Sequence, residues 1–430
     1  MKRLAENDRL LILLIIVAQL ALSALAIQRR HGQYLLGDNY FYETPAWNLA
    51  SGHGLSMETS IADDPWLTLS YRAAHPESAG SVYVPSTTYA PGYTVFLAGV
   101  YVLAGHHHLA AVLANLGLLI VFLILCWQIV KKMCTSPVEK LVAAGLMAVF
   151  PGWAFWVSAI LSDMLNATLI AGFAVLFFTE TPTRKRALLA GLVLGAAILV
   201  RPYPTLLPIG LFVGWLVRKV PAFAPRYLIP MSLVAWACLG TWTVRNQIAY
   251  GKLVPVTSMG LGRGLWQTTY SAGLFEDVSK DPEFQRDDHV LGAAVGDWHY
   301  HDASAAFQKA AMERIKAQPV RWLGMASWRV VRLWISAVAD GAPRIVLLGF
   351  GLLQVVMLLA LVAGIFVAWQ DQRAMVAGAI VLVVFHWALF VPFGAEGRLL
   401  LAVRVFSIAL GAMAAGALYR RWRGIAPVEP

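Results

Sequence analysis

Long, mostly apolar stretches limit how this chain can fold more than any other feature of its sequence. They are about 14 to 25 residues long, close to the length that a helix needs to cross a bilayer. The stretches are Leu10–Ile27, Leu109–Val130, Leu141–Ser162, Met164–Thr179, Ala187–Val200, Tyr203–Val217, Tyr227–Val244, Ile345–Trp369, Ala374–Phe393 and Leu399–Leu418. They predict an all-α polytopic membrane protein with about ten membrane-spanning helices.

The composition indicates the same class of protein. The chain has 430 residues, of which 59% are hydrophobic and 13% charged, and its mean hydropathy of +0.63 lies outside the range of soluble globular proteins. The net charge of +10 does not indicate nucleic-acid binding, because many Lys and Arg residues flank apolar runs, where they contact lipid headgroups. The first run is long for the core of a cleaved signal peptide, so we expect an uncleaved first helix.

Short basic segments between the runs predict the orientation, because Lys and Arg near helix ends stay on the cytoplasmic side. One face receives Lys2-Arg3, Lys131-Lys132, Arg184-Lys185-Arg186, Arg218-Lys219, Arg373 and Arg420-Arg421-Trp422-Arg423. Both termini are therefore predicted to be cytoplasmic, although Arg29-Arg30 opposes this orientation. We expect the short run from Pro91 to Gly105 to lie along the outer interface.

This orientation places two long segments on the outer face, residues 28–108 and 246–344, and both are rich in Trp, Tyr, Gly and Pro. The second segment ends near Pro319–Trp334, where Trp and Arg recur at helical spacing, which indicates an interfacial amphipathic helix. Residues 1–430 are predicted to form one integral-membrane domain, without a separate soluble C-terminal domain.

Arginines at the outer ends of apolar runs are the first candidates for a binding site. Arg201, Arg245 and Arg398 each abut a run at the predicted outer face, and Arg404 lies inside the last run. A charge costs about 2.5 to 3.5 kcal/mol at mid-bilayer, so we expect an anionic partner to offset it. A lipid-linked phosphate fits, because guanidinium binds phosphate oxygens in a bidentate fork. Ordinary headgroup anchors are the alternative, and for Arg404 a buried carboxylate or helix carbonyls.

Four acidic residues map to the same predicted face: Asp38, Glu43, Asp163 and Glu396. A carboxylate near bound phosphate and sugar can act as a general base toward an incoming hydroxyl or amine. Taken alone, an aspartate just after a helix is more often a solvated loop residue.

Histidines form two clusters, which leave open whether the protein binds a divalent cation. His299-Tyr300-His301 is flanked by Asp297 and Asp302, and His106-His107-His108 is the second cluster. Neither has a complete ligand set at an established spacing, so interfacial loop histidines are the alternative. The segment Gly260–Gly264 lacks the strand-loop-helix setting of a phosphate loop, and no nucleotide or organic cofactor is expected.

Short motifs follow one another in a characteristic order along most of the chain. They are Asp38 with Tyr42, Ala46, Leu49, Gly52 and Gly54; Pro91-Gly92-Tyr93; Pro151 with Ser162-Asp163; Gly195 with Val200-Arg201-Pro202; Arg245-Asn246 with Gly251, Val254-Pro255-Val256 and Gly260; Ile315–Pro319; and Glu396-Gly397-Arg398. In this order they resemble the GT-C membrane glycosyltransferases, in the branch of the protein O-mannosyltransferases and lipid A aminoarabinose transferases.

The resemblance implies a glycosyltransferase that moves a sugar from a polyprenyl-phosphate donor to a lipid, glycan or protein acceptor at the periplasmic face of a bacterial inner membrane. Asp38 matches the family's acid in the first outer loop and would be the catalytic base. Arg201, Arg245 and Arg398 would stabilise the phosphate of the leaving group, and direct attack would invert the anomeric carbon. The remaining substrate-binding candidates are Tyr42, Glu43, Asp163, Glu396 and Arg404.

Two other classes of function remain open at this level. A transporter or flippase of lipid-linked sugars would use the same arginines to guide phosphate through the bilayer. Transporters commonly show repeated halves and polar residues near mid-membrane, whereas the polar residues here gather at one predicted face. A membrane scaffold without catalysis is the third reading, since a fold alone does not guarantee an activity.

Overall fold

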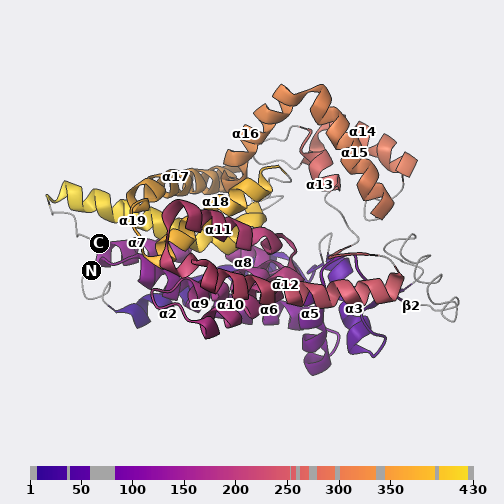
Figure 1. The fold of residues 1–430 in the computed structure, drawn as a ribbon, viewed down its shortest axis with the longest axis horizontal. Helices are drawn as coiled ribbons and strands as arrows, with labels where there is room; N and C mark the ends of the chain where they lie inside the picture. Colours follow the sequence, from indigo (N-terminus) through magenta and orange to yellow (C-terminus); the bar gives the residue numbers. More distant parts are fainter. Residues whose placement is uncertain are drawn as a thin grey trace.

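The apolar runs fold into helices that pack against one another in one bundle (Figure 1). The computed structural model describes residues 7–35, 39–58, 83–251, 253–257, 262–270, 278–295, 301–335, 344–392 and 397–424. The helices formed by the runs are α2 (Asp8–Arg29), α6 (His108–Met133), α7 (Pro137–Val149) with α8 (Pro151–Val157), α9 (Asp163–Phe177), α10 (Arg184–Val200), η4 (Tyr203–Leu206) with α11 (Leu207–Arg218), α12 (Pro225–Tyr250), α17 (Arg344–Ala368), α18 (Ala374–Phe390) and η7 (Gly397–Val403) with α19 (Arg404–Trp422).

Six helices of the described part of the chain are long and apolar enough to span a membrane. They include the joined pairs α7 with α8 and η7 with α19, whereas α9, α18 and η4 with α11 are shorter apolar helices. The prediction of a largely helical chain with membrane-spanning helices is confirmed. The number of spans and their orientation stay predictions.

Local sequence sets where several helices begin and end. At the start of α7, the Ser136 hydroxyl accepts a hydrogen bond from the Glu139 N–H, and the Glu139 carboxylate accepts one from the Ser136 N–H, which is a capping box. Pro151 starts α8, so the run Leu141–Ser162 forms two consecutive helices and a turn instead of one helix. α10 ends at Val200, and the backbone of the next residue, Arg201, is extended because a proline follows it.

Close helix packing at the centre of the bundle depends on two glycines of α10. Gly191 and Gly195 face α12, and a Cβ atom at Gly191 would lie 2.5 Å from the Met231 carbonyl oxygen. A Cβ atom at Gly195 would lie 2.6 Å from Cys238 Sγ. This small-xxx-small spacing lets two membrane helices approach closely and gain van der Waals contact.

The basic loops of the sequence lie together at one end of the bundle. Arg373 Nη1 donates to the Lys132 carbonyl at 3.1 Å, Lys132 Nζ to the Val175 carbonyl at 3.4 Å, and Arg218 Nη2 to the Trp369 carbonyl at 2.7 Å. The first residues of α2 and the last residues of α19 lie at the same end, on the left of Figure 1. This arrangement agrees with the predicted clustering of basic loops on one face.

The opposite end of the bundle carries the first predicted outer segment. It contains α3 (Tyr40–Ala50), the strands β1 (Ser56–Glu58) and β2 (Tyr83–Pro85), and α5 (Pro91–Ala104). The two strands pair antiparallel, with Met57 opposite Val84. These elements lie on the right of Figure 1, beside the last turns of α12.

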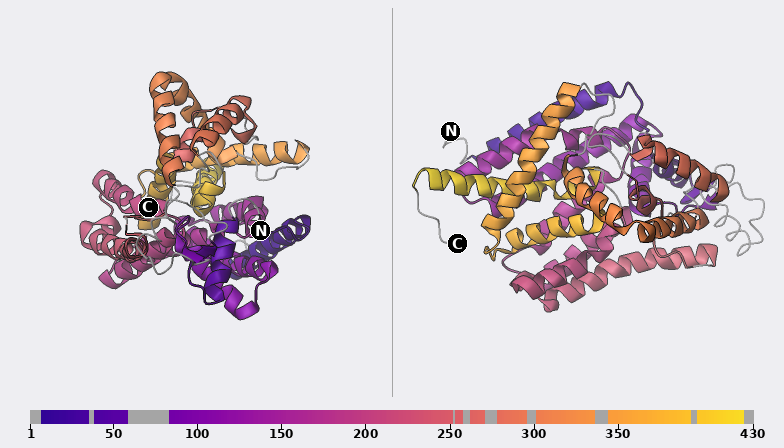
Figure 2. Two further views of the ribbon diagram at one scale, coloured as in Figure 1. Left: turned by 90° about the vertical axis from the view of Figure 1, so that its right-hand side faces the viewer. Right: turned by 90° about the horizontal axis from the view of Figure 1, so that it is seen from above.

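The second predicted outer segment forms a small helical module above the first (Figures 1 and 2). It consists of α13 (Gly262–Gln267), η6 (Val278–Lys280), α14 (Pro282–Val295), α15 (His301–Ala317) and α16 (Pro319–Ile335), around an aromatic core that includes Trp266 and Phe307. The predicted amphipathic helix is present as α16, and its place at the interface stays a prediction. Arg329 of α16 links module and bundle, because Nη1 donates to the Thr268 carbonyl at 2.8 Å and Nε to the Val391 carbonyl at 2.7 Å.

Candidate functional site

An ion pair between Asp163 and Arg201 lies at the end of the bundle away from the basic loops. Arg201 Nη2 donates to Asp163 Oδ2 at 2.8 Å, and Arg201 Nε donates to Ser162 Oγ at 3.0 Å. The Asp163 side chain is 1% exposed and that of Arg201 is 17% exposed. Asp163 lies in the first turn of α9, where the helix dipole stabilises a negative charge. The fold therefore brings together two residues that the sequence predicted as separate candidates.

Tyr42 connects this ion pair to α3. Its hydroxyl lies 3.2 Å from Ser162 Oγ, the same atom that accepts a hydrogen bond from Arg201. The Tyr42 ring stacks on Tyr89 with centroids 4.7 Å apart and meets the edge of Tyr93 at 5.3 Å. Two aromatic contacts leave the Tyr42 ring little freedom, so its hydroxyl is held at the pair.

A second polar chain runs from α9 into the bundle. Asn166 Nδ2 donates to the Tyr203 hydroxyl at 2.9 Å, and that hydroxyl lies 3.3 Å from His386 Nε2. His386 Nδ1 lies 2.8 Å from the Leu382 carbonyl, which makes Nδ1 the donor and leaves Nε2 to accept from Tyr203. This row of hydrogen bonds was not predicted from the sequence. His386 was the signal for it, because an ionisable residue inside an apolar run is a functional candidate by default.

Glu43 faces a different part of the first outer segment. Its carboxylate contacts His106 Nε2 and lies 3.4 Å from His108 Nε2. These three side chains offer ligand atoms that all lie within 4.8 Å of one another, so they could hold a metal ion. The sequence predicted Glu43 and the His106–His108 cluster separately, and the fold brings them together.

Arg245 and Arg398 lie near the same end of the bundle in different surroundings. Arg245 Nη1 donates to the Ser86 carbonyl at 3.1 Å and Nη2 to the Leu55 carbonyl at 3.2 Å, so α12 holds both strands of the hairpin region. The Arg398 guanidinium lies over the Trp156 ring, 5.6 Å from its centroid. Its helix η7 packs against α8 and α9.

Arg404 is buried where α19 begins, with an exposure of 2%. Nη2 donates to the Trp334 carbonyl at 3.1 Å and to Gln354 Oε1 at 3.2 Å, and the guanidinium lies 4.5 Å from the centre of the Trp334 ring. Within the described part of the chain, Arg404 pairs with no carboxylate, and its Nε and Nη1 atoms have no hydrogen-bond partner. Of the alternatives for its partner, helix carbonyl and amide oxygens are the ones observed.

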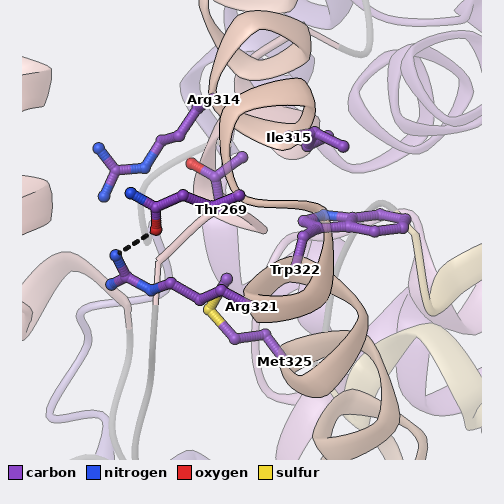
Figure 3. Close-up of a pocket in the computed structure, with 7 residues that line it drawn as sticks. Thr269, Arg314, Ile315, Arg321, Trp322 and Met325 are labelled. Atoms are coloured by element: carbon purple, nitrogen blue, oxygen red, sulfur yellow. Dashed lines mark hydrogen bonds between the residues drawn. The ribbon is translucent and has the colours of Figure 1, made fainter.

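A shallow pocket lies in the outer module, between the turn that follows α13 and the helices α15 and α16 (Figure 3). It is lined by Thr269, Arg314, Ile315, Gln318, Arg321, Trp322 and Met325. Arg321 donates to Gln318 Oε1 at 3.1 Å and to Glu283 Oε2 at 2.9 Å, and Arg314 also contacts Glu283. The hydrogen bond from Arg321 holds the pKa of the Glu283 carboxyl below its usual value. These arginines, like Arg201, are paired with an acid.

Solved structures that resemble this chain identify its fold. No protein-family model and no curated protein matches the sequence. A structure of an oligosaccharyltransferase from Archaeoglobus fulgidus, in complex with Zn and sulfate, aligns with 96% of this chain and 50% of its own, at a TM-score of 0.53 and 10% identity. The chain has a GT-C fold. A structure of the oligosaccharyltransferase AglB from the same organism, with an inhibitory peptide and a dolichol-phosphate, aligns with 96% of this chain and 52% of its own, at a TM-score of 0.48 and 10% identity.

This likeness concerns the fold alone, because the identity is low and the chain spans about half the length of the solved structures it matches. The GT-C architecture predicted from the sequence is confirmed. The branch of protein O-mannosyltransferases and aminoarabinose transferases stays a prediction.

Two predicted site residues, Asp38 and Glu396, lie outside the described residues, as do Asp297, His299 and the side chains of His301 and Asp302. The described residues near Asp38 in the sequence contact the turn that leads to Asp163. The Tyr34 carbonyl accepts hydrogen bonds from Asn39 Nδ2 at 2.9 Å and from the Ile160 N–H at 3.3 Å. Ile160 belongs to the turn that leads into α9 at Asp163.

Proposed function

We propose that this protein is a membrane glycosyltransferase that moves a sugar from a polyprenyl-phosphate-linked donor to an acceptor hydroxyl or amine, at the periplasmic face of a bacterial inner membrane. The observation that carries the proposal is the ion pair of Asp163 and Arg201, joined to α3 through Ser162 and Tyr42. The fold shared with an archaeal oligosaccharyltransferase supports it.

Arg201 is the proposed ligand of the donor phosphate. Its side chain is 17% exposed, against 1% for Asp163, so the cation is accessible while its carboxylate partner is covered. Guanidinium groups form strong charge-assisted hydrogen bonds to phosphate, and they stabilise charge that develops on a leaving phosphate. Arg398 and Arg404 begin the last helical segment and are proposed to add positive charge. Arg245 of α12, which holds the hairpin region, is also proposed to stabilise the leaving phosphate.

Two buried acceptor atoms on α9 support a site for sugar or acceptor hydroxyls. Asp163 Oδ1 and Asn166 Oδ1 have no hydrogen-bond partner among the described residues. Buried polar atoms nearly always have a partner, so these oxygens are suited to donors that a substrate brings. Tyr42 and, on the last helix, Glu396 are proposed to contact the same substrates.

Asp38 is the proposed general base. It would take the proton of the acceptor as the acceptor oxygen or nitrogen attacks the anomeric carbon. The bond between that carbon and the phosphate oxygen would break, and the lipid phosphate would leave with both bonding electrons, paired with Arg201. One such displacement inverts the anomeric configuration.

The experiment that tests the proposal separates transfer from transport. The purified chain is reconstituted in lipid vesicles with a polyprenyl-phosphate donor carrying a radiolabelled sugar, and membrane extracts supply the acceptors. We expect label in a new glycosidic bond together with free polyprenyl phosphate. Movement of intact donor across the vesicle membrane, without any glycosidic bond formed, would instead support a flippase.

A further inference from the structure

Glu43, His106 and His108 gather three metal-binding groups from two separate segments. Glu43 lies in the first turn of α3, His106 lies in the turn between α5 and α6, and His108 begins α6. The Glu43 side chain is 10% exposed, whereas the two histidines are about one-third exposed, at 36% and 37%. The cluster therefore has a covered carboxylate and an open side toward solvent.

The spacing of Glu43 and His108 suits a tetrahedral ion. With bonds of about 2.0 to 2.1 Å to nitrogen and oxygen, two ligands of a tetrahedral zinc ion lie about 3.3 to 3.4 Å apart. Glu43 Oε1 and His108 Nε2 are 3.4 Å apart, and all three ligand atoms lie within 4.8 Å. Two imidazoles with one carboxylate form a ligand set typical of zinc, with one position left for water.

Aromatic contacts hold the His106 side chain in place. The His106 ring stacks on Trp47 with centroids 4.4 Å apart and 6° between the planes, and it meets Tyr101 edge-on at 5.0 Å. Trp47 lies one turn after Glu43 on α3, so the same helix supplies one ligand and supports another. Groups that fix ligand orientation raise metal affinity.

We propose that Glu43, His106 and His108 bind one zinc ion, which fastens α3 to the turn between α5 and α6. The bound zinc would also position Tyr42, because Tyr42 directly precedes Glu43 in α3. The Tyr42 hydroxyl contacts Ser162 Oγ, which accepts a hydrogen bond from Arg201. Zinc binding itself does not depend on the proposed glycosyltransferase activity. The effect on the position of Tyr42 is a positioning role for the ion.

Zinc titration of the purified full chain in detergent tests the site. After treatment with a chelator, ZnCl₂ is added in competition with a chromophoric chelator, and one equivalent is expected to bind. Even changes outside the ligand set lower metal affinity about 10- to 100-fold, so Glu43→Gln, His106→Ala and His108→Ala should each lower it by at least about 100-fold. The matched control is His107→Ala, since His107 is exposed and its side chain makes no capping hydrogen bond.

The two results that overturn the site are clear. Wild-type protein would bind no more zinc than Glu43→Gln, or His107→Ala would lower zinc affinity as much as His108→Ala. Folding of each variant is checked by thermal melting without zinc, where it should match the stripped wild type. Zinc should then raise the melting temperature of wild type and His107→Ala, and it should leave Glu43→Gln and His108→Ala unchanged.

Hydrogen exchange tests the positioning role separately. Zinc should slow amide exchange across residues 40–50 of the wild type and not in His108→Ala. Bound zinc with unchanged exchange in this segment would overturn the positioning role. Neither measurement uses sugar transfer, so a failed transfer assay and a failed zinc site are distinguishable.

Discussion

The ion pair of Asp163 and Arg201 gives the most direct test of how the outer end of the bundle is stabilised. Asp163→Asn and Arg201→Gln each remove one charge and leave the other within the protein. At an effective dielectric constant of 20, two charges about 4 Å apart attract one another by about 4 kcal/mol. Breaking a buried pair by removing one partner costs about 3 to 5 kcal/mol.

The two single variants should differ in a defined direction. Arg201→Gln leaves a carboxylate that is 1% exposed, whereas Asp163→Asn leaves a guanidinium that is 17% exposed and reaches solvent more easily. We therefore expect Arg201→Gln near the upper end of the range and Asp163→Asn near the lower end. The double variant should lose much less than the sum, with a coupling energy of up to about 3 kcal/mol.

Reversible unfolding in mixed micelles, followed by tryptophan fluorescence during titration with a denaturing detergent, measures these free energies. The pair Lys140 and Asp8 provides the control, because its atoms are 3.3 Å apart and its side chains are 23% and 35% exposed. The corresponding cycle should give a coupling of about 0 to 1 kcal/mol. Additive losses for Asp163 and Arg201, or single losses below that of the control pair, would refute the reasoning.

Three further predictions concern packing, pH and a buried charge. Gly191→Ala should lower the free energy of unfolding by about 1 to 3 kcal/mol because its Cβ would meet α12, whereas Gly240→Ala, with nothing within 4 Å, should leave it unchanged or raise it by up to about 1 kcal/mol in the same titration. The lowered pKa of Glu283 means that its contribution to stability is complete above the usual pKa of 4.5 and is lost as pH falls through the folded value. Once the intrinsic exchange rate, which itself falls in acid, is divided out, the protection of the α14 amides should therefore decrease in acid, and Glu283→Gln should remove that decrease. The same decrease in Glu283→Gln would contradict the role of Arg321. Arg404→Met removes a positive charge proposed for the donor site, so it should raise the KM for a polyprenyl-phosphate donor. It should not lower the free energy of unfolding, because two buried nitrogens of Arg404 lack partners among the described residues. An unchanged KM would remove Arg404 from the donor site.

The helices were predictable because a long apolar run has one favourable arrangement in a bilayer. Each of the ten runs falls on one helix or on two consecutive helices. The break between α7 and α8 was not predicted, although Pro151 marked its place. A helix boundary that a proline sets depends only on nearby residues, so it can be predicted from the sequence.

The candidate site was predictable only as separate residues. Asp163 and Arg201 both stood out because charges next to apolar runs are costly, but their pairing depends on how α9 and α10 pack. Glu43 and His106 are joined in the same way, by the packing of α3 on the end of α5. Spacing along the chain carries no information about such contacts, which is why the metal-binding cluster had no complete ligand set in the sequence.

The central claim is that Asp38 is the base of a sugar transfer. Its most direct test is the initial rate of transfer from a polyprenyl-phosphate donor, measured in lipid nanodiscs for wild type, Asp38→Asn and Asp371→Asn, an aspartate at the end of the bundle with the basic loops. General base catalysis contributes about 100- to 10,000-fold, so Asp38→Asn should lower the rate by at least about 100-fold while Asp371→Asn keeps the wild-type rate. A wild-type rate for Asp38→Asn would contradict the account.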